Sequence, residues 1–154
     1  MLNKLRTRSQ SESGFTLVEL LVVMLILGLL AAIAIPSFFN QRDKAKDADA
    51  KSAVRTAQTA METYATDNDG SYLNATSDGT APYAAGSLQA IEETLGDVGT
   101  RLTIVTAEAD NYEVQVASEV TGQNFRIARD ANGVTTNTCD VGGTAGCPSD
   151  GNWD

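Results

Sequence analysis

The chain has 154 residues with 11 basic and 20 acidic side chains and no histidine, so its formal net charge at pH 7 is −9. This length suffices for one modest domain plus an extended element. Histidine is the usual general base near neutral pH and the commonest metal ligand. Its absence excludes a Ser-His-Asp triad, a His-Cys pair and zinc held by imidazole. We therefore expect no enzymatic activity, no cofactor and no metal.

Charge is unevenly distributed along the chain. Residues 1–14 carry three basic side chains against one acid, whereas 13 acids face three arginines from Asn68 onward. A basic start, a long apolar run and an acidic body are typical of a membrane protein whose N-terminus stays in the cytoplasm. Because an acidic body repels phosphate, we expect no direct binding of nucleic acid.

The apolar run extends from Phe15 to Phe39, and Glu19 is its only charged residue. A helix of this length covers roughly 37 Å, which is enough to cross a bilayer. Gly28 and Pro36 interrupt the run, and each weakens a helix locally. The composition therefore predicts a helical membrane segment.

After Phe39 the pattern becomes amphipathic. Apolar side chains recur at helical spacing on one face, namely at Ala50, Ala53, Val54, Ala57, Ala60, Met61 and Tyr64. We expect one helix from about Phe15 to about Asp67, whose second half covers part of its own domain. Gly70 is expected to end it in a left-handed conformation. The acids around Gly70 weakly resemble a calcium loop, but further ligands needed at fixed offsets are missing.

The remainder predicts a loop, a short helix and a sheet. Residues 70–86, with Pro82 and Tyr83, form the loop, and Ser87 is the N-cap of a short helix that ends before Gly96. Alternation predicts strands around Leu102–Thr106, Tyr112–Val116 and Phe125–Ile127, with Val134 in a possible fourth. An antiparallel meander has one apolar face, and the amphipathic half of the helix is its obvious cover. The fold class is therefore α+β.

Two cysteines, Cys139 and Cys147, lie in a Gly-rich stretch near the C-terminus. A single disulfide closing a short loop is the better interpretation, since too few ligands are present for a metal site. It implies an oxidising compartment outside the cytoplasm. We expect Trp153 to cover the sheet or to pack beside this loop.

The segment Ser13–Leu20, SGFTLVEL, resembles the class III signal of type IV prepilins, including the pseudopilins of type II secretion systems. The resemblance implies that a prepilin peptidase cuts after Gly14 and methylates Phe15, and it places the family's glutamate at Glu19. Gly28 and Pro36 match positions where pilin helices loosen on assembly.

This resemblance divides the chain into three parts. Residues 1–14 are a cleaved cytoplasmic leader, residues 15–40 a transmembrane helix that later enters a filament core, and residues 41–154 a globular pilin headpiece.

Glu19 also stands out on physical grounds. A charge inside an apolar membrane helix costs at least ~2.5–3.5 kcal/mol on insertion scales, so it should have a partner. The amine that cleavage would create at Phe15 lies about one turn away, roughly 6 Å along the helix. In the monomer we expect Glu19 to have no structural function. The alternative is a glutamate that reaches the membrane interface from the helix end.

The resemblance implies a structural subunit of a type IV pilus-like filament, used for adhesion, motility or DNA uptake, and most like a major type IVa pilin. Its partners would be further pilin subunits, the prepilin peptidase and the assembly platform with its ATPase. The precursor would span the cytoplasmic membrane once with a cytoplasmic N-terminus, and the filament would lie on the cell surface.

Other interpretations stay open at this point. Major pseudopilins of type II secretion systems share the helix but usually lack the disulfide and carry a calcium site; a minor pilin is also possible. A membrane-anchored binding domain that never polymerises is the third class, and it would not depend on Glu19. Finally, Ala32-Ile33-Ala34 matches an ordinary signal peptidase site, which would leave a secreted domain beginning at Ile35.

Overall fold

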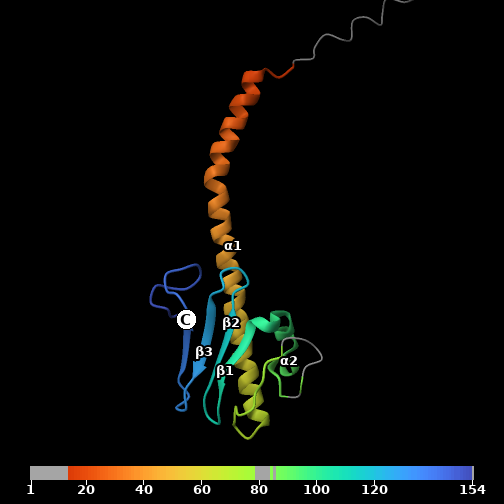
Figure 1. Cartoon of the computed structure of the whole chain (residues 1–154), viewed down its shortest axis with the longest axis vertical. Helices are drawn as coiled ribbons and strands as arrows, with labels where there is room; N and C mark the ends of the chain where they lie inside the picture. Colours follow the sequence, from red (N-terminus) through yellow and green to blue (C-terminus); the bar gives the residue numbers. More distant parts are fainter. Residues whose placement is uncertain (1–13, 79–83, 85, 154) are drawn as a thin grey trace, which may run out of the picture. The chain divides into compact units, whose positions relative to one another are not determined.

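The computed structural model describes residues 14–78, 84 and 86–153 (Figure 1). The predicted leader up to residue 13, and Pro82 and Tyr83 of the predicted loop, lie outside the described residues. The chain divides into two compact units, residues 1–39 and residues 40–154. Each unit is described below by itself.

The predicted long helix is confirmed. Helix α1 runs over Leu17–Asp67 and contains Pro36. It ends where the sequence indicates, because the Gly70 N–H donates back to the Ala65 carbonyl over 2.8 Å and Gly70 has a φ of 82°. Such a positive φ is easily adopted by glycine, which has no Cβ.

The second unit contains a four-stranded antiparallel sheet in the order β1-β2-β3-β4. Its strands are β1 Leu102–Ala107, β2 Tyr112–Ala117, β3 Asn124–Arg129 and β4 Thr135–Cys139. The register pairs Leu102 with Val116, Val114 with Ile127, and Phe125 with Cys139. The predicted meander is thus confirmed, although the fourth strand begins one residue after Val134.

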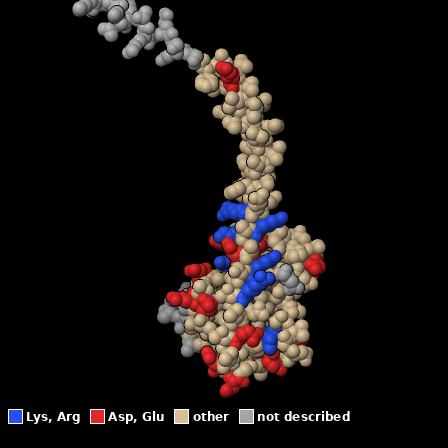
Figure 2. Space-filling model, turned by 180° about the vertical axis from the view of Figure 1, so that it is seen from behind, with Lys and Arg blue, Asp and Glu red and all other residues tan. Residues whose placement is uncertain are grey.

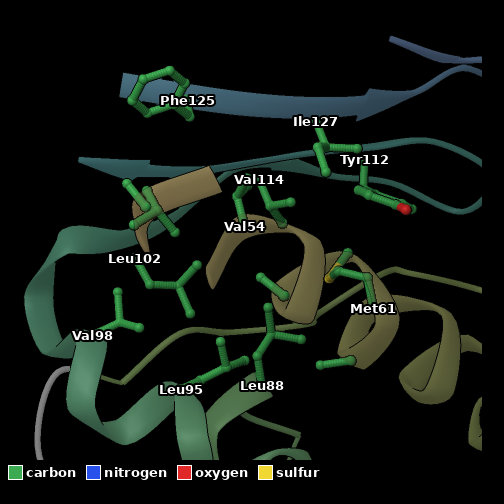
Figure 3. Close-up of a cluster of buried hydrophobic side chains, with 14 of the residues drawn as sticks. Val54, Met61, Leu88, Leu95, Val98, Leu102, Tyr112, Val114, Phe125 and Ile127 are labelled. Carbon is green, nitrogen blue, oxygen red and sulfur yellow. The ribbon is translucent and has the colours of Figure 1, made fainter. Parts of the chain in front are cut away.

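One face of this sheet packs against the amphipathic part of α1 (Figure 3). Val54 and Met61 of α1 are fully buried, as are Val114 and Ile127 of the sheet. Period-two burial in the strands and three-to-four spacing in the helix bring these apolar rows together. The predicted stripe on α1 forms the helical side of the core, with Ala53 partly buried at its border.

The region before the sheet differs from the prediction. Ser87 does cap helix α2, Leu88–Ile91, and its side chain accepts from the Gln89 N–H. Helix α2 ends before Gly96, as predicted, because Glu92 is extended. The sequence did not predict the separate 3-10 helix η1 over Glu93–Arg101, which is interrupted at Gly99 with a φ of 58°. Burial of Leu95 and Val98 keeps this segment helical past the first glycine.

Candidate functional site

In the described part of the first unit, residues 14–39, the apolar side chains are not buried. Leu25 is 74% exposed and Ile33 is 72% exposed, and Phe15 at the start of the apolar run is 80% exposed. Among the described residues, α1 is the one helix long and apolar enough to cross a membrane, and none of its most apolar window is buried. Since exposed apolar surface is unfavourable in water, this unit requires lipid or other protein around it.

Glu19 has a local partner at the start of α1. The Thr16 N–H and the Thr16 hydroxyl each donate to Glu19 Oε2 over 2.8 Å, and the Glu19 N–H donates to Thr16 Oγ1 over 3.2 Å. These reciprocal bonds form a capping box, which satisfies donors that the first helical turn leaves free. The expectation that Glu19 has no structural function in the monomer is therefore wrong. The T-x-x-E spacing was a signal that could have shown this.

Gly14, Phe15 and Gly28 are exposed in the structure. A Cβ added at Gly14 or Gly28 would meet no atom within 4 Å, and neither glycine has a positive φ. This chain's own packing therefore does not require glycine at either position. A requirement for glycine at 14 or 28 would come from a protein that contacts this segment.

Pro36 lies inside α1 without ending it. Proline has no N–H to donate to the carbonyl four residues earlier, that of Ala32, so the helix lacks one bond there. Ala32-Ile33-Ala34 of the alternative secretion signal is in the same helical stretch.

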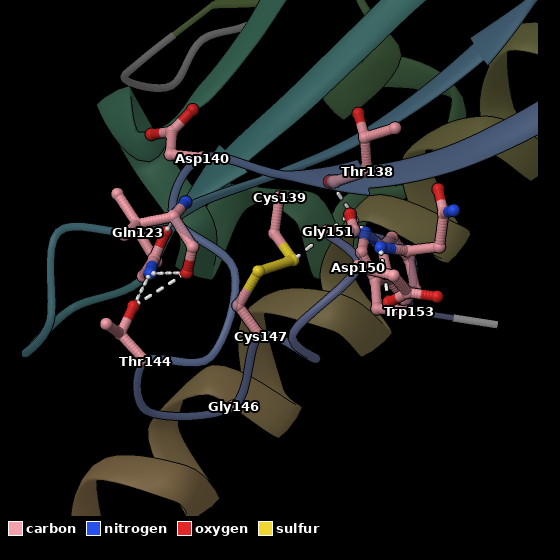
Figure 4. Close-up of a disulfide and its surroundings, with 12 residues drawn as sticks. Gln123, Thr138, Cys139, Asp140, Thr144, Gly146, Cys147, Asp150, Gly151 and Trp153 are labelled. Carbon is pink, nitrogen blue, oxygen red and sulfur yellow. Dashed lines mark hydrogen bonds between the residues drawn. A yellow bond between two sulfur atoms is a disulfide. The ribbon is translucent and has the colours of Figure 1, made fainter.

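The predicted disulfide Cys139–Cys147 is present, with its Cα atoms 6.0 Å apart (Figure 4). The Gln123 side chain is buried beside the loop, donates to the Val141 carbonyl over 3.0 Å and accepts from the Val141 N–H over 3.1 Å. The disulfide and Gln123 thus hold the loop from two sides.

Trp153 packs beside this loop and against the sheet, as predicted. It is 2% exposed, and its indole N–H donates to the Thr138 carbonyl over 2.7 Å. Its ring meets the Phe125 ring edge to face at 5.9 Å between centroids. The cationic groups of Lys51 and Arg55 lie over the Trp153 ring at 5.7 and 5.2 Å, which links the C-terminal segment to α1.

Sequence reasoning missed Asp47, which is fully buried on the apolar face of α1. Its carboxylate accepts from the Thr121 hydroxyl over 2.7 Å and from the Gly146 N–H over 2.8 Å. One turn later, the Lys51 ammonium donates to the Gly146 carbonyl over 2.6 Å. Together these residues fasten the disulfide loop to α1.

The fit around Gly146 is close. A Cβ on Gly146 would lie 2.7 Å from the Asp47 Cβ, a distance that real Cβ atoms essentially never show. Burial lowers the pKa of Lys51, an effect that the Asp47 charge opposes. The sequence did contain a signal for a buried Asp47, because Asp47 comes three residues before Ala50 and so continues the apolar face of the helix.

Glu62 joins α1 to the other end of the sheet. Its two carboxylate oxygens accept from the Tyr72 and Tyr112 hydroxyls, each over 2.9 Å. Burial, followed by the hydrogen bond to Glu62, raises the pKa of both tyrosines. Both phenols therefore stay neutral donors at ordinary pH, and this cluster acts in packing rather than in proton transfer.

Within the described residues, no three His, Cys, Asp or Glu side chains are placed to hold a metal ion. The candidate site is therefore an exposed apolar helix whose first turn is capped by Thr16 and Glu19. Separately, buried hydrogen bonds stabilise the headpiece.

Comparison with known protein families finds a match at the N-terminal end of the chain. The prokaryotic N-terminal methylation motif matches residues 9–35 of this chain. These residues contain the predicted cleavage position and most of the apolar run.

Three relatives are similar to the N-terminal part of the chain. The type II secretion system core protein G of Pseudomonas aeruginosa is 41% identical over 59 residues, covering 38% of this chain and 42% of that protein. The type IV major pilin protein PilA of Myxococcus xanthus is 41% identical over 56 residues, covering 36% and 26%. Competence protein ComGC of Halalkalibacterium halodurans is 34% identical over 58 residues, covering 38% and 57%.

The N-terminal part of the chain is thus similar to both type IV pilins and pseudopilins, and it carries their N-terminal methylation motif. The matched region spans less than half the length of the first relatives. No solved structure is significantly similar to the chain.

Proposed function

We propose that the chain is a subunit of a type IV pilus-like filament. A membrane-anchored precursor with a cytoplasmic N-terminus is cut after Gly14 by a prepilin peptidase and methylated at Phe15. The assembly platform and its ATPase then add it to a growing fibre on the cell surface. The observation that carries this proposal is the apolar run from Phe15 to Phe39, in which no residue is buried although it precedes a well-packed headpiece.

Packing of helices from many copies would cover this surface. Relative to exposure in water, each Leu, Ile or Val side chain buried between helices contributes about 1.5–3 kcal/mol, so the filament core replaces the cover that lipid gives the precursor. The headpiece core contains no residue of the apolar run. This supports a function in which neighbouring subunits cover the apolar helix. Gly28 and Pro36 are the proposed loosening points, since one has no side chain and the other lacks an N–H.

Glu19 would serve assembly beyond its capping bonds. Cleavage at Gly14 creates a positive amine on Phe15, one turn from the carboxylate, in a filament core with little water. Losing one member of such a buried pair typically costs about 3–5 kcal/mol. The pairing is with Phe15 of the same chain or of the neighbouring subunit.

A pseudopilus of a type II secretion system is the second candidate function. It is favoured by the relatives that carry the name core protein G. The Cys139–Cys147 disulfide favours a pilus, since the resemblance implies that major pseudopilins usually lack one. The pseudopilus would be favoured if parent cells carry no surface fibres and a strain that lacks this protein fails to export proteins.

Shearing filaments from cells and analysing their main subunit by mass spectrometry tests the proposal. The expected N-terminus is Phe15 carrying one methyl group. A mature protein that begins at Ile35 would contradict it and would indicate ordinary secretion. Gly14→Val should leave uncut precursor in the membrane, whereas Gly14→Ala should be mild.

A further inference from the structure

Two free cations follow the apolar half of α1 directly. Arg42 and Lys44 are exposed, and neither forms an ion pair with any residue in the part of the chain that the structure describes. We propose that Arg42 and Lys44 bind the phosphate groups of anionic lipids while the precursor is in the membrane. This inference rests on the membrane-anchored stage of the proposed function and not on polymerisation.

The neighbouring residues leave these two cations without an ion pair among the described residues, although the pKa of Glu119 is lowered by Lys46 and further by the charge of Arg42. Lys46 is already engaged, since its ammonium lies 2.7 Å from the Glu119 carboxylate. Asp43 is the only acid among residues 40–46. Figure 2 shows the basic side chains of the second unit gathered mostly along α1, with the acidic ones spread over several parts of the same face. The free positive charge thus belongs to the stretch nearest to the apolar run.

The position along the chain matches the depth of a lipid headgroup layer. The hydrocarbon core of a bilayer is about 30 Å thick and the whole bilayer about 40–45 Å, so each headgroup layer is roughly 5–7 Å. The helical residues Leu17–Phe39 are enough to cross the core at about 1.5 Å per residue. Arg42 and Lys44 come three and five residues after Phe39, about 4.5 and 7.5 Å further along the helix. Arg42 then falls in the headgroup layer on the headpiece side, and the long Lys44 side chain can reach back into it.

Two exposed aromatic rings mark the same boundary. Phe38 is 66% exposed and Phe39 is 51% exposed, at the end of the apolar run. The apolar Phe rings fit the edge of the hydrocarbon core, and long basic side chains that follow directly can reach lipid phosphate.

A second copy of the chain is the competing partner, since the headpiece is acidic overall. On the face that Figure 2 shows, the acids are spread over several parts and do not form one patch. The link between these cations and the apolar run therefore favours lipid.

The test uses the full chain reconstituted into phosphatidylcholine vesicles that contain traces of spin-labelled phosphatidylglycerol or phosphatidylcholine. Electron spin resonance then measures which lipid is held at the protein. We expect a preference for phosphatidylglycerol of roughly two- to fivefold, which high salt removes, since each cation near an anionic surface attracts it individually. The double variant Arg42→Gln/Lys44→Gln should show no preference.

The matched control is Arg55→Gln. It removes one charge from an exposed position of the same helix, about 20 Å further from the apolar run than Arg42. It should keep the preference of the parent chain.

The outcomes distinguish membrane anchoring from the contact with anionic lipid. A chain that does not float with vesicles would overturn membrane anchoring and the lipid contact with it. A chain that floats but shows equal affinity for both lipids overturns only the lipid contact. Lower filament yield in the double variant with unchanged lipid preference would also overturn it and assign both cations to subunit contacts.

Discussion

The two units of the chain use apolar side chains in opposite ways. In the first unit Val22 is 48% exposed, whereas in the second Val54 of the same helix is fully buried. The acidic side chains of the two units differ in the same way. Glu19 is exposed and hydrogen-bonded to Thr16, whereas Asp47 is buried and accepts hydrogen bonds from Thr121 and Gly146. The second unit has its own buried core, whereas the described apolar side chains of the first unit are exposed.

The largest expected effect in the second unit comes from Asp47→Ala. It leaves the Gly146 N–H and the Thr121 hydroxyl without acceptors, so we expect a loss of about 3 kcal/mol in the free energy of unfolding. Urea denaturation in detergent, followed by the fluorescence of the single, buried Trp153, measures it. Asp49→Ala, at an exposed position of the same helix, is the control and should change stability by less than about 0.5 kcal/mol. Equal stabilities of the two variants would show that the loop is not held by Asp47.

Removing the disulfide should be nearly as costly. A loop of this length restricts the unfolded chain by roughly 2–3 kcal/mol, so Cys139→Ser/Cys147→Ser should lower the unfolding free energy by that amount. Insertion of the first unit into membranes should not change. In the parent protein, thiol reagents should label neither cysteine without reductant; labelling of both would contradict the disulfide.

A matched pair of valines compares the units directly. Val54→Ala should destabilise the headpiece by about 2 kcal/mol, since it removes two buried methyl groups and leaves a cavity. Val22→Ala should leave headpiece unfolding unchanged, because no residue of the folded unit covers it. The same denaturation experiment measures both, and a similar loss for Val22→Ala would refute the distinction between the units.

The smallest effect is expected for Glu119→Gln at the surface. The hydrogen bond and charge of Lys46 hold the pKa of Glu119 below its ordinary value of 4.5. A carboxyl whose pKa is lower in the folded state stabilises the fold above its unfolded pKa, and this contribution is lost as pH falls through the folded pKa. The variant should therefore be slightly less stable than the parent at pH 7 and equal to it well below pH 4. A difference that persists in acid would indicate another cause.

Elements with a regular repeat could be predicted from the sequence. The apolar stripe that ends at Tyr64 and the alternation in β2 could be predicted from local periodicity. The disulfide could be predicted because the chain has two cysteines and too few further ligands for a metal site. Asp47 could not be predicted in the same way, because its partner Gly146 is 99 residues away and only the folded chain brings them together. The 3-10 helix η1 before β1 was not predicted, because the burial of Leu95 and Val98 that accompanies it depends on the folded core rather than on a local repeat.

The central claim is that the charge of Glu19 serves assembly, and counting surface filaments on cells that express Glu19→Gln tests it most directly. Glutamine can keep the capping box with Thr16 but removes the charge. Thr16→Val is the matched control, since it removes the capping hydroxyl and keeps the carboxylate. We predict normal membrane levels for both variants, few or no filaments for Glu19→Gln, and clearly more for Thr16→Val. Filaments of Glu19→Gln as abundant as those of the parent would contradict the account.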